Sequence, residues 1–150
     1  DSLELNDEGL EPFIQINPKV INKLSIQLRD DQDLQFDVLM CLSGVDYPEY
    51  LEVVYHLHSL KFNHKLILKL KTARKKAKIP SVAWVWRTAD WHERETYDLY
   101  GIEFVDHPDL RRILLPEDWE GFPLRKDYVT PESYQGIKIQ DSEAGEKNDK

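Results

Sequence analysis

The sequence predicts an α+β fold, in which helices cover a small, mainly antiparallel four-stranded sheet and a long extended C-terminal arm follows. Three observations support this prediction. Two segments carry helix-capping residues or helical spacing, and four segments look like strands. The last third holds charges, aromatics and prolines with no sustained period. Strands and helices that do not alternate regularly are typical of α+β folds.

The first predicted elements lie between residues 12 and 29. The segment 12–17 (PFIQIN) predicts a short strand. Asn17 suits a helix N-cap, and Pro18 suits the first helical position, where its missing N–H costs nothing. Apolar residues then follow with helical spacing at Val20, Ile21, Leu24 and Leu28. We therefore expect a helix from Pro18 to Arg29.

Three strand-like runs come next, over residues 36–45, 50–60 and 64–71. Apolar residues alternate clearly in the last two, at Leu51, Val53, Tyr55 and Leu57 and at Leu66, Leu68 and Leu70. The short connections favour an antiparallel meander. The first run is more uniformly apolar, which indicates a more central position.

A second helix is predicted from Trp91 to Tyr100. Ser81 can cap a short helical piece before it, over residues 82–86. Asp90 and Glu93 have the spacing of a capping box. Gly101 stands where a left-handed C-cap belongs, so we expect the helix to end there.

The composition is that of a globular chain. Of 150 residues, 41% are hydrophobic and 32% charged, the net charge is −8, and no apolar run approaches the ~20 residues that span a bilayer. The single cysteine, Cys41, excludes an internal disulfide, fits a reducing compartment and lies in an apolar run that predicts a buried thiol. Because the chain begins Asp1-Ser2 and its only methionine is Met40, we expect the true start to be missing or processed.

Four regions are expected along the chain. They are an N-terminal segment (1–11), an α+β domain (12–104), the C-terminal arm (105–135) and a disordered polar tail (136–150).

The residue types of common active sites do not assemble in this sequence. His92-Glu93 begins like the zinc motif HExxH, but position 96 is Thr. His56 and His58 share one strand face, without the further ligands that a metal site needs. Glu93 and Glu95 lie about 200° apart on a helix, so they cannot both face one substrate. We therefore expect no catalytic, metal or cofactor-binding residues in this chain.

A basic segment, residues 61–78, holds eight Lys or Arg and no Asp or Glu. Three interpretations remain open. It is a solvated edge and loop, a docking surface for a partner or an anionic surface, or a nucleic-acid-binding element. The acidic net charge argues against nucleic acid for the protein as a whole.

The helix at 91–100 and the C-terminal arm carry charges and aromatics that are typical of protein interfaces. Arg94 and Asp98 are one turn apart and can pair. Prolines stiffen the arm and lower the entropy lost on docking. Wrapping around its own domain is the alternative to docking on another subunit. The candidate interface residues are Glu93, Arg94, Glu95, Asp98, His107, Arg111, Arg112, Trp119, Arg125, Lys126, Asp127 and Tyr128.

These residues resemble a known family, the 30 kDa subunit of proton-pumping NADH:quinone oxidoreductase, respiratory complex I, which is also called its C subunit. A close relative is the J subunit of the photosynthetic NDH complex. The resemblance is carried by Glu93-Arg94-Glu95, Asp98, Gly101-Ile102, His107-Pro108, Leu110, Arg112-Ile113-Leu114, Trp119, Gly121 and the run from Pro123 to Tyr128. Upstream, residues 43–47, 53–56 and 80–82 also look like the family, and the likeness runs from about residue 12 to 135.

The resemblance implies a cofactor-free protein of the hydrophilic arm, packed against the larger D subunit that helps form the quinone site. Flavin, iron–sulfur clusters, NADH and quinone would be bound by partner proteins of the complex. It implies a peripheral position on the cytoplasmic face of the bacterial inner membrane, or the equivalent organelle face. Equivalent subunits of photosynthetic NDH, coenzyme F420-linked and membrane-hydrogenase complexes remain alternatives. Two alternatives belong to other functional classes. They are a nucleic-acid-binding module that uses Lys61–Lys78 and a hydrolase that uses Glu93 or Glu95.

Overall fold

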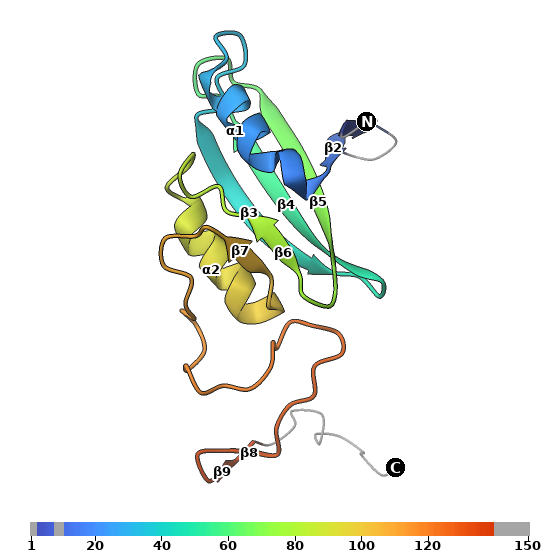
Figure 1. Cartoon of the computed structure of the whole chain (residues 1–150), viewed down its shortest axis with the longest axis vertical. Coiled ribbons are helices and arrows are strands. Elements are labelled where there is room, and N and C mark those ends of the chain that lie inside the picture. Colours follow the sequence, from blue (N-terminus) through green and yellow to red (C-terminus); the bar gives the residue numbers. More distant parts are fainter. Residues whose placement is uncertain (1–2, 8–10, 140–150) are drawn as a thin grey trace, which may run out of the picture.

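The computed structural model describes residues 3–7 and 11–139, which form an α+β fold with a five-stranded mixed sheet. Figure 1 shows α1 lying across one face of this sheet and α2 packed near its β3 side. In chain order the elements are β1 (Leu3–Asn6), β2 (Phe13–Ile16), the 3-10 turn η1 (Pro18–Val20), α1 (Ile21–Asp30), β3 (Val38–Asp46), β4 (Tyr50–His58), β5 (Lys65–Ala73), β6 (Lys78–Pro80), α2 (Ala89–Tyr100), β7 (Glu103–Val105), β8 (Ser133–Tyr134) and β9 (Ile137–Lys138).

The sheet contains the four predicted strands, but the prediction of a four-stranded sheet is wrong because β1 adds a fifth. The strand order is β1-β2-β5-β4-β3, and only the pair β2–β5 is parallel. The helix α1 carries the chain from β2 to the far edge at β3. The hairpins β3–β4 and β4–β5 then bring the chain back beside β2. After these two reversals β5 runs in the same direction as β2, so the two strands pair in parallel. The more apolar β3 is an edge strand and not a central one.

The helix predicted from Pro18 begins with the 3-10 turn η1, and α1 itself begins only at Ile21, whose N-cap Val20 makes no side-chain cap bond within the described residues. The side chain of Asn17 accepts a hydrogen bond from Lys19 N at 3.0 Å, and Pro18 opens the 3-10 turn that leads into α1. Ile21 and Leu28 from α1 are buried against the sheet. Asn17 therefore caps the 3-10 turn that leads into α1, and the apolar stripe sets the face that α1 buries.

A small β–α–β unit, unpredicted from the sequence, precedes the C-terminal arm. Its strands β6 and β7, which precede and follow α2 in the chain, pair with each other in parallel. The predicted helical piece at 82–86 is one turn only, in which Trp86 N donates to Val82 O. The predicted capping box is also wrong, because α2 begins at Ala89 and its N-cap, Thr88, makes no side-chain cap bond in the described structure. The left-handed cap at Gly101 is confirmed, with φ of 67°.

The core lies between the sheet and the elements on the α1 side. Alternate residues of β4 and β5, such as Tyr55 and Leu70, are fully buried there. The outer edge of β3 is covered by α2 and the residue before it. Thr88 Oγ1 donates to Leu39 O at 3.1 Å, and Leu42 N donates to His92 Nδ1 at 3.4 Å. These bonds satisfy an edge that would otherwise attract another strand.

Gly44 on β3 lets α2 approach the sheet closely. A Cβ at this position would lie 2.6 Å from Tyr100 Cδ2 and 3.0 Å from Thr96 Cγ2. We expect Gly44→Ala to lower the free energy of unfolding by about 1–3 kcal/mol, because the helix must shift to admit the methyl group. Urea denaturation measures this, with Ser43→Ala, at the exposed neighbouring position, as the control. Equal losses for the two variants would contradict a tight contact at Gly44.

The C-terminal arm has little regular structure beyond the β8–β9 hairpin. In Figure 1 it runs from β7 around the end of α2 and then away from the sheet. Leu124 N donates to Leu99 O at 3.1 Å, so part of the arm folds back onto its own domain rather than remaining extended. The predicted disordered tail lies mainly outside the described residues, and the predicted domain boundaries stay predictions.

Candidate functional site

Asp98 is the centre of the contacts between α2 and the C-terminal arm. Its buried carboxylate accepts hydrogen bonds at Oδ2 from the backbone N–H groups of Ile113, Leu114 and Leu115, at 2.7–3.0 Å. Its Oδ1 accepts from Arg112 Nη1 at 2.7 Å. Burial alone would raise the pKa of Asp98, but these bonds outweigh it and lower the pKa. The predicted Arg94–Asp98 pair is therefore wrong, since Asp98 pairs with Arg112.

Arg112 extends this contact into the next part of the arm. Its Nη2 donates to Trp119 O at 3.0 Å and to Gly121 O at 3.1 Å. Trp119 Nε1 in turn donates to Tyr128 Oη at 3.1 Å. The Arg112 guanidinium thus joins α2 to a turn at Gly121, nine residues beyond Arg112 in the chain.

A second fastening joins the arm to the end of α2. Arg125 Nε donates to Tyr100 O at 2.6 Å, and its guanidinium lies 4.9 Å from the centre of the Phe122 ring. The Phe122 ring lies against Gly101, which has no side chain to obstruct it. The arm therefore packs directly over the C-cap of α2.

A third contact between the arm and the domain involves Asp46 and Arg74, neither of which was among the candidate interface residues predicted from the sequence. The buried Asp46 accepts from Lys126 N at 2.7 Å and pairs with Arg74, which also contacts Asp127 at 3.0 Å. Burial would raise the pKa of Asp46, but Arg74 and the Lys126 amide outweigh it and lower the pKa. In the sequence Asp46 looks like an ordinary turn residue, so its role had no local signal.

Glu93 lies in a buried polar cluster and is fully inaccessible to solvent. Its carboxylate accepts from Ser81 Oγ at 2.6 Å and from Val82 N at 2.8 Å, and His107 Nε2 lies 3.8 Å away. Burial raises the pKa of Glu93 to about 7, although the bonds from Ser81 and Val82 oppose the rise. A carboxyl group with such a pKa exchanges a proton near neutral pH.

The other candidate residues divide by exposure. Arg94 is buried, donates weakly to Arg111 O at 3.4 Å and lies 5.0 Å from the Trp91 ring centre. Glu95, Arg111, Lys126 and Asp127 are exposed, whereas Arg112, Trp119, Arg125 and Tyr128 are half-buried. The buried members Glu93, Arg94 and Asp98 thus contact their own chain, and exposed members remain accessible to a partner.

Large apolar side chains are exposed around this site. Trp84 is 73% and Trp91 62% exposed, at the turn before α2 and in its first turn. The arm adds Leu114, Leu124 and Val129, which are 50–85% exposed. Where exposed apolar side chains form a contiguous patch they are typical of protein-interaction surfaces, which makes these residues candidates for partner contacts.

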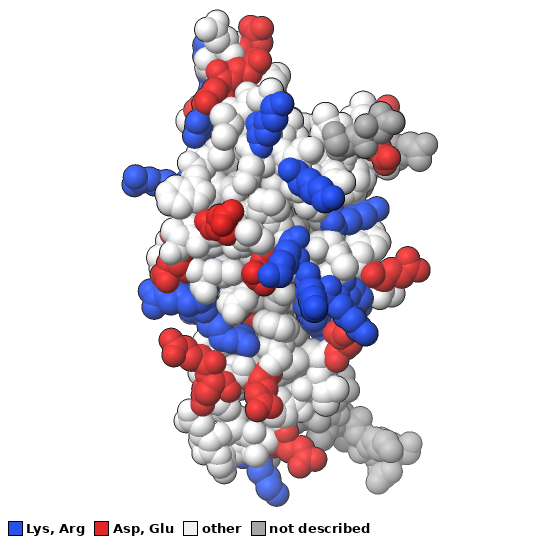
Figure 2. All heavy atoms as spheres, in the orientation of Figure 1, with Lys and Arg blue, Asp and Glu red and all other residues white. Residues whose placement is uncertain are grey.

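The basic segment 61–78 is partly neutralised. Arg74 pairs with Asp46 and Asp127, and Lys78 pairs with Glu103. Figure 2 shows lysine and arginine side chains across the middle of the α1 face, with acidic side chains above and below them. Positive charge on this face is therefore interrupted rather than continuous.

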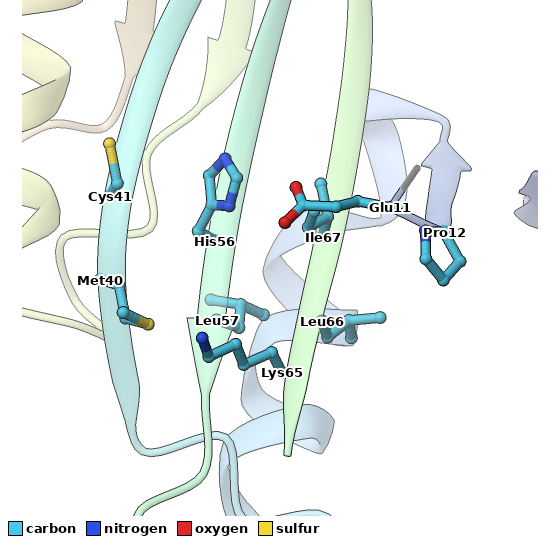
Figure 3. Close-up of a pocket in the computed structure, with 9 residues that line it drawn as sticks. All are labelled: Glu11, Pro12, Met40, Cys41, His56, Leu57, Lys65, Leu66 and Ile67. Atoms are coloured by element: carbon cyan, nitrogen blue, oxygen red, sulfur yellow. The ribbon is translucent and has the colours of Figure 1, made fainter. Parts of the chain in front are cut away.

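The sheet face opposite α1 holds a shallow pocket. Figure 3 shows Met40, Cys41, His56 and Ile67 on this side, while Leu57 lies on the α1 side of the strands. Cys41 is half-buried here, so the predicted buried thiol is wrong. A β-bulge beside it explains the difference, since the register shifts between Leu39 and Cys41.

Two further observations concern metals and membranes. Among residues 3–7 and 11–139, no three His, Cys, Asp or Glu side chains gather closely enough to hold a metal ion. Within those same ranges, no helix has the length and apolar character needed to cross a bilayer.

Residues 14–134 match the family described as the 30 Kd subunit of respiratory-chain NADH dehydrogenase. The chain belongs to this family. The C subunit of NADH-quinone oxidoreductase from Chloroherpeton thalassium is 49% identical over 139 residues, covering 91% of this chain and 58% of that protein. The corresponding protein of Chlorobium phaeobacteroides is 54% identical over 119 residues, covering 77% of this chain and 72% of that protein. The chain thus spans little more than half of the first relative.

Two solved structures agree with the fold. A trypsin-resistant fragment of Nqo5 matches with a TM-score of 0.63 and 26% identity, covering 72% of this chain and 89% of the fragment. A chain of an archaeal membrane-bound sulfane sulfur reductase matches with a TM-score of 0.72 and 21% identity, covering 85% of this chain and 78% of that one. The second likeness concerns the fold alone. The family resemblance read from the sequence is confirmed.

Proposed function

We propose that this chain is a cofactor-free structural subunit of the hydrophilic, quinone-reducing arm of an NADH:quinone oxidoreductase. It docks onto the quinone-site subunit and supports electron transfer from NADH to quinone, coupled to proton translocation. Partner subunits bind the flavin, the iron–sulfur clusters, NADH and quinone. The observation that carries this proposal is the family match over residues 14–134, together with relatives that are the C subunit of this enzyme.

The geometry supports a docking role for the C-terminal arm. Asp98, Arg112 and Arg125 hold the arm in one conformation through bonds to its own chain. A segment ordered before docking loses less conformational entropy when it binds. The arm also offers Leu114, 60% exposed, and Val129, 85% exposed, which a partner can cover.

The membrane position follows from the same proposal. The subunit lies on the cytoplasmic face of the bacterial inner membrane, or the equivalent organelle face, and reaches the membrane only through its partners. Its exposed apolar residues, such as Trp84 and Trp91, serve protein contacts in this arrangement.

The test is co-purification of the tagged full chain from native membranes, with its partners identified by mass spectrometry. We expect Arg125→Ala to lower recovery of the quinone-site subunit about tenfold. The charge-assisted bond to Tyr100 O and the contact with Phe122 both hold the arm in place, and a loss of about 1.4 kcal/mol is a factor of ten.

Lys23→Ala is the control, since Lys23 is an exposed cation on α1, outside the arm and outside the segment that carries the exposed Trp84 and Trp91. The control variant should recover the same amount of partner subunits as the unmodified chain. Both variants should have the circular dichroism spectrum of the unmodified chain. Recovery of no NADH:quinone oxidoreductase subunit by the unmodified chain would overturn the proposed function. Equal recovery by the two variants would overturn only the docking role of Arg125.

A further inference from the structure

The sheet face opposite α1 carries no helix in the part of the chain that the structure describes. Ile21 and Leu28 of α1 pack on the other face, and α2 contacts that same face at Gly44. Side chains alternate along a strand, so Val54 of β4 and Ile67 of β5 point to the uncovered side of β3, β4 and β5, which we call the open face. A solvated face of an antiparallel sheet is usually polar. The open face departs from that pattern, since Val54 and Ile67 are apolar and half-buried.

A β-bulge turns a further apolar side chain toward the open face. The register between β3 and β4 shifts between Leu39 and Cys41, so Met40 has no partner residue in β4. Met40 is 52% exposed and lies with Cys41 on the open face (Figure 3). Bulges re-aim side chains and occur often beside functional sites. Methionine adapts its shape to a partner and is common on protein-binding surfaces.

The shallow pocket lies beside Met40 on this face. Its volume is about 420 Å³, and its lining is mainly apolar. Figure 3 shows His56 and Ile67 in the middle of the pocket, with Met40 on one side and Pro12 on the other. Such a lining fits an apolar side chain, because a charged group would lose water there without a partner.

Three lysines of β5 follow one another along the open face. Lys65, Lys69 and Lys71 alternate with core residues, and Ile67 stands between the first two. Lys69 Nζ lies 3.8 Å from the centre of the Phe13 ring, and Lys71 Nζ lies 4.8 Å from the centre of the Tyr50 ring. In residues 3–7 and 11–139 none of these three lysines forms an ion pair. Their charges therefore remain available to carboxylates of another molecule.

The acidic residues of the open face do not cancel this charge. Glu52 stands opposite Lys71, but it is only 3% exposed, so a partner does not reach its carboxylate. Glu4 lies on β1, two strands from β5, which is about 10 Å. Glu11 is exposed at the pocket. The accessible charge beside the pocket is therefore mainly positive, although the chain as a whole carries −8.

We propose that the open face binds a segment of a partner protein that places carboxylates against Lys65, Lys69 and Lys71 and an apolar side chain in the pocket beside Met40. A protein segment fits both features, since it can carry acidic and apolar side chains at alternating positions. A nucleic acid would match the lysines but not the apolar pocket, and Ile67 interrupts the lysine row.

This surface is separate from the C-terminal arm. The arm is held by Asp46 at the end of β3, whereas Met40 lies near the start of that strand, about 20 Å away. The arm also contacts the domain on the α2 side of the sheet. The inference therefore does not rest on the proposed function, and the partner at the open face is defined only by its chemistry.

The experiment is zero-length cross-linking of the full chain in its native assembly. A water-soluble carbodiimide joins a lysine amine to a carboxylate only where the two groups are in contact, and mass spectrometry of the digest identifies both residues. We expect Lys65, Lys69 or Lys71 to be joined to an aspartate or glutamate of another protein. Cross-links to the chain's own carboxylates alone, or none, would overturn the inference. If NADH:quinone oxidoreductase subunits co-purify without these cross-links, the proposed function still stands.

Two variants at one position test the pocket. Met40→Asp puts a carboxylate in the pocket and leaves every lysine in place, so the yield of the cross-links should fall at least about tenfold. Met40→Leu keeps an apolar side chain of similar volume and should keep the yield. If Met40→Asp does not fold by circular dichroism, Lys65→Glu at an exposed position should lower the cross-links of Lys69 and Lys71 instead. Equal yields for Met40→Asp and Met40→Leu would contradict a partner side chain in the pocket.

Direct binding assays separate a protein partner from other anionic partners. The purified chain is titrated in low salt with a single-stranded thymidine oligonucleotide and with vesicles of phosphatidylcholine and phosphatidylglycerol. Binding to phosphates would weaken steeply with salt, because the contacts release counterions. We expect neither probe to bind at the open face. Binding of either probe that Lys65→Glu abolishes would overturn the assignment to a protein partner.

Discussion

Replacing Asp98 with alanine is expected to lower the free energy of unfolding by about 3–5 kcal/mol. Asp98 is fully buried, and its removal leaves the Arg112 guanidinium, whose side chain is only 14% exposed, without its carboxylate. The three N–H groups of Ile113, Leu114 and Leu115 lose their acceptor at the same time. These donors are only part-buried, so each adds less than the roughly 1–3 kcal/mol that a fully buried unsatisfied donor costs. Urea denaturation followed by circular dichroism measures the loss.

Glu95→Ala is the matched control for this prediction. Glu95 is a carboxylate on the same helix but is exposed, so its removal should change stability by no more than about 0.5 kcal/mol. A double-mutant cycle with Arg112→Ala isolates the pair itself, and we expect a coupling of at least about 1 kcal/mol. Losses for Asp98→Ala as small as those for Glu95→Ala would show that the carboxylate does not anchor the arm.

Local patterns were enough to predict the elements of the domain that bury one face. Strands β4 and β5 alternate apolar residues over nine residues each, and Asn17 and Gly101 carry the capping chemistry of their helix ends. These signals depend on residues that are neighbours in the chain, so tertiary packing does not alter them. The same holds for the apolar stripe of α1.

Pairings between distant segments had no comparable signal. Strands β6 and β7 are three residues each, too short to show a period, and they are recognised only by their parallel pairing around α2. The parallel pair β2–β5 likewise depends on the path of α1 across the sheet. A sequence that predicts each strand can therefore still predict the wrong strand order and count.

The candidate site shows the same limit at the level of single side chains. Helical spacing placed Arg94 one turn from Asp98, yet the partner is Arg112, fourteen residues beyond Asp98. The capping-box spacing predicted that the Glu93 side chain would cap the start of α2. Its carboxylate instead accepts hydrogen bonds from Ser81 and from the Val82 amide. Both acids are drawn into tertiary contacts because burial and several donors outweigh one exposed local bond.

Gly101→Ala is expected to lower the free energy of unfolding by about 2–4 kcal/mol, which adds the cost of a left-handed alanine to that of overpacking. Gly101 has φ of 67°, and a Cβ there would lie 2.4 Å from Phe122 Cε2. The Phe122 ring must move, and the Arg125 guanidinium stacked on it must move as well. Urea denaturation measures the loss of stability, and exchange of the Leu124 amide, bonded to Leu99 O, reports whether the arm has detached.

Gly136→Ala separates the two causes. Gly136 has φ of 80°, so alanine meets a similar backbone strain there, but apart from its two chain neighbours no described residue has an atom within 4 Å of the added Cβ. We expect this variant to lose only about 1 kcal/mol and to keep the Leu124 amide protected. Because the two glycines share the strain and differ in the contact, any loss beyond that of Gly136→Ala measures the packing of Phe122 against the helix end. Equal losses for the two variants would mean that the contact of Phe122 with the C-cap of α2 does not stabilise the arm.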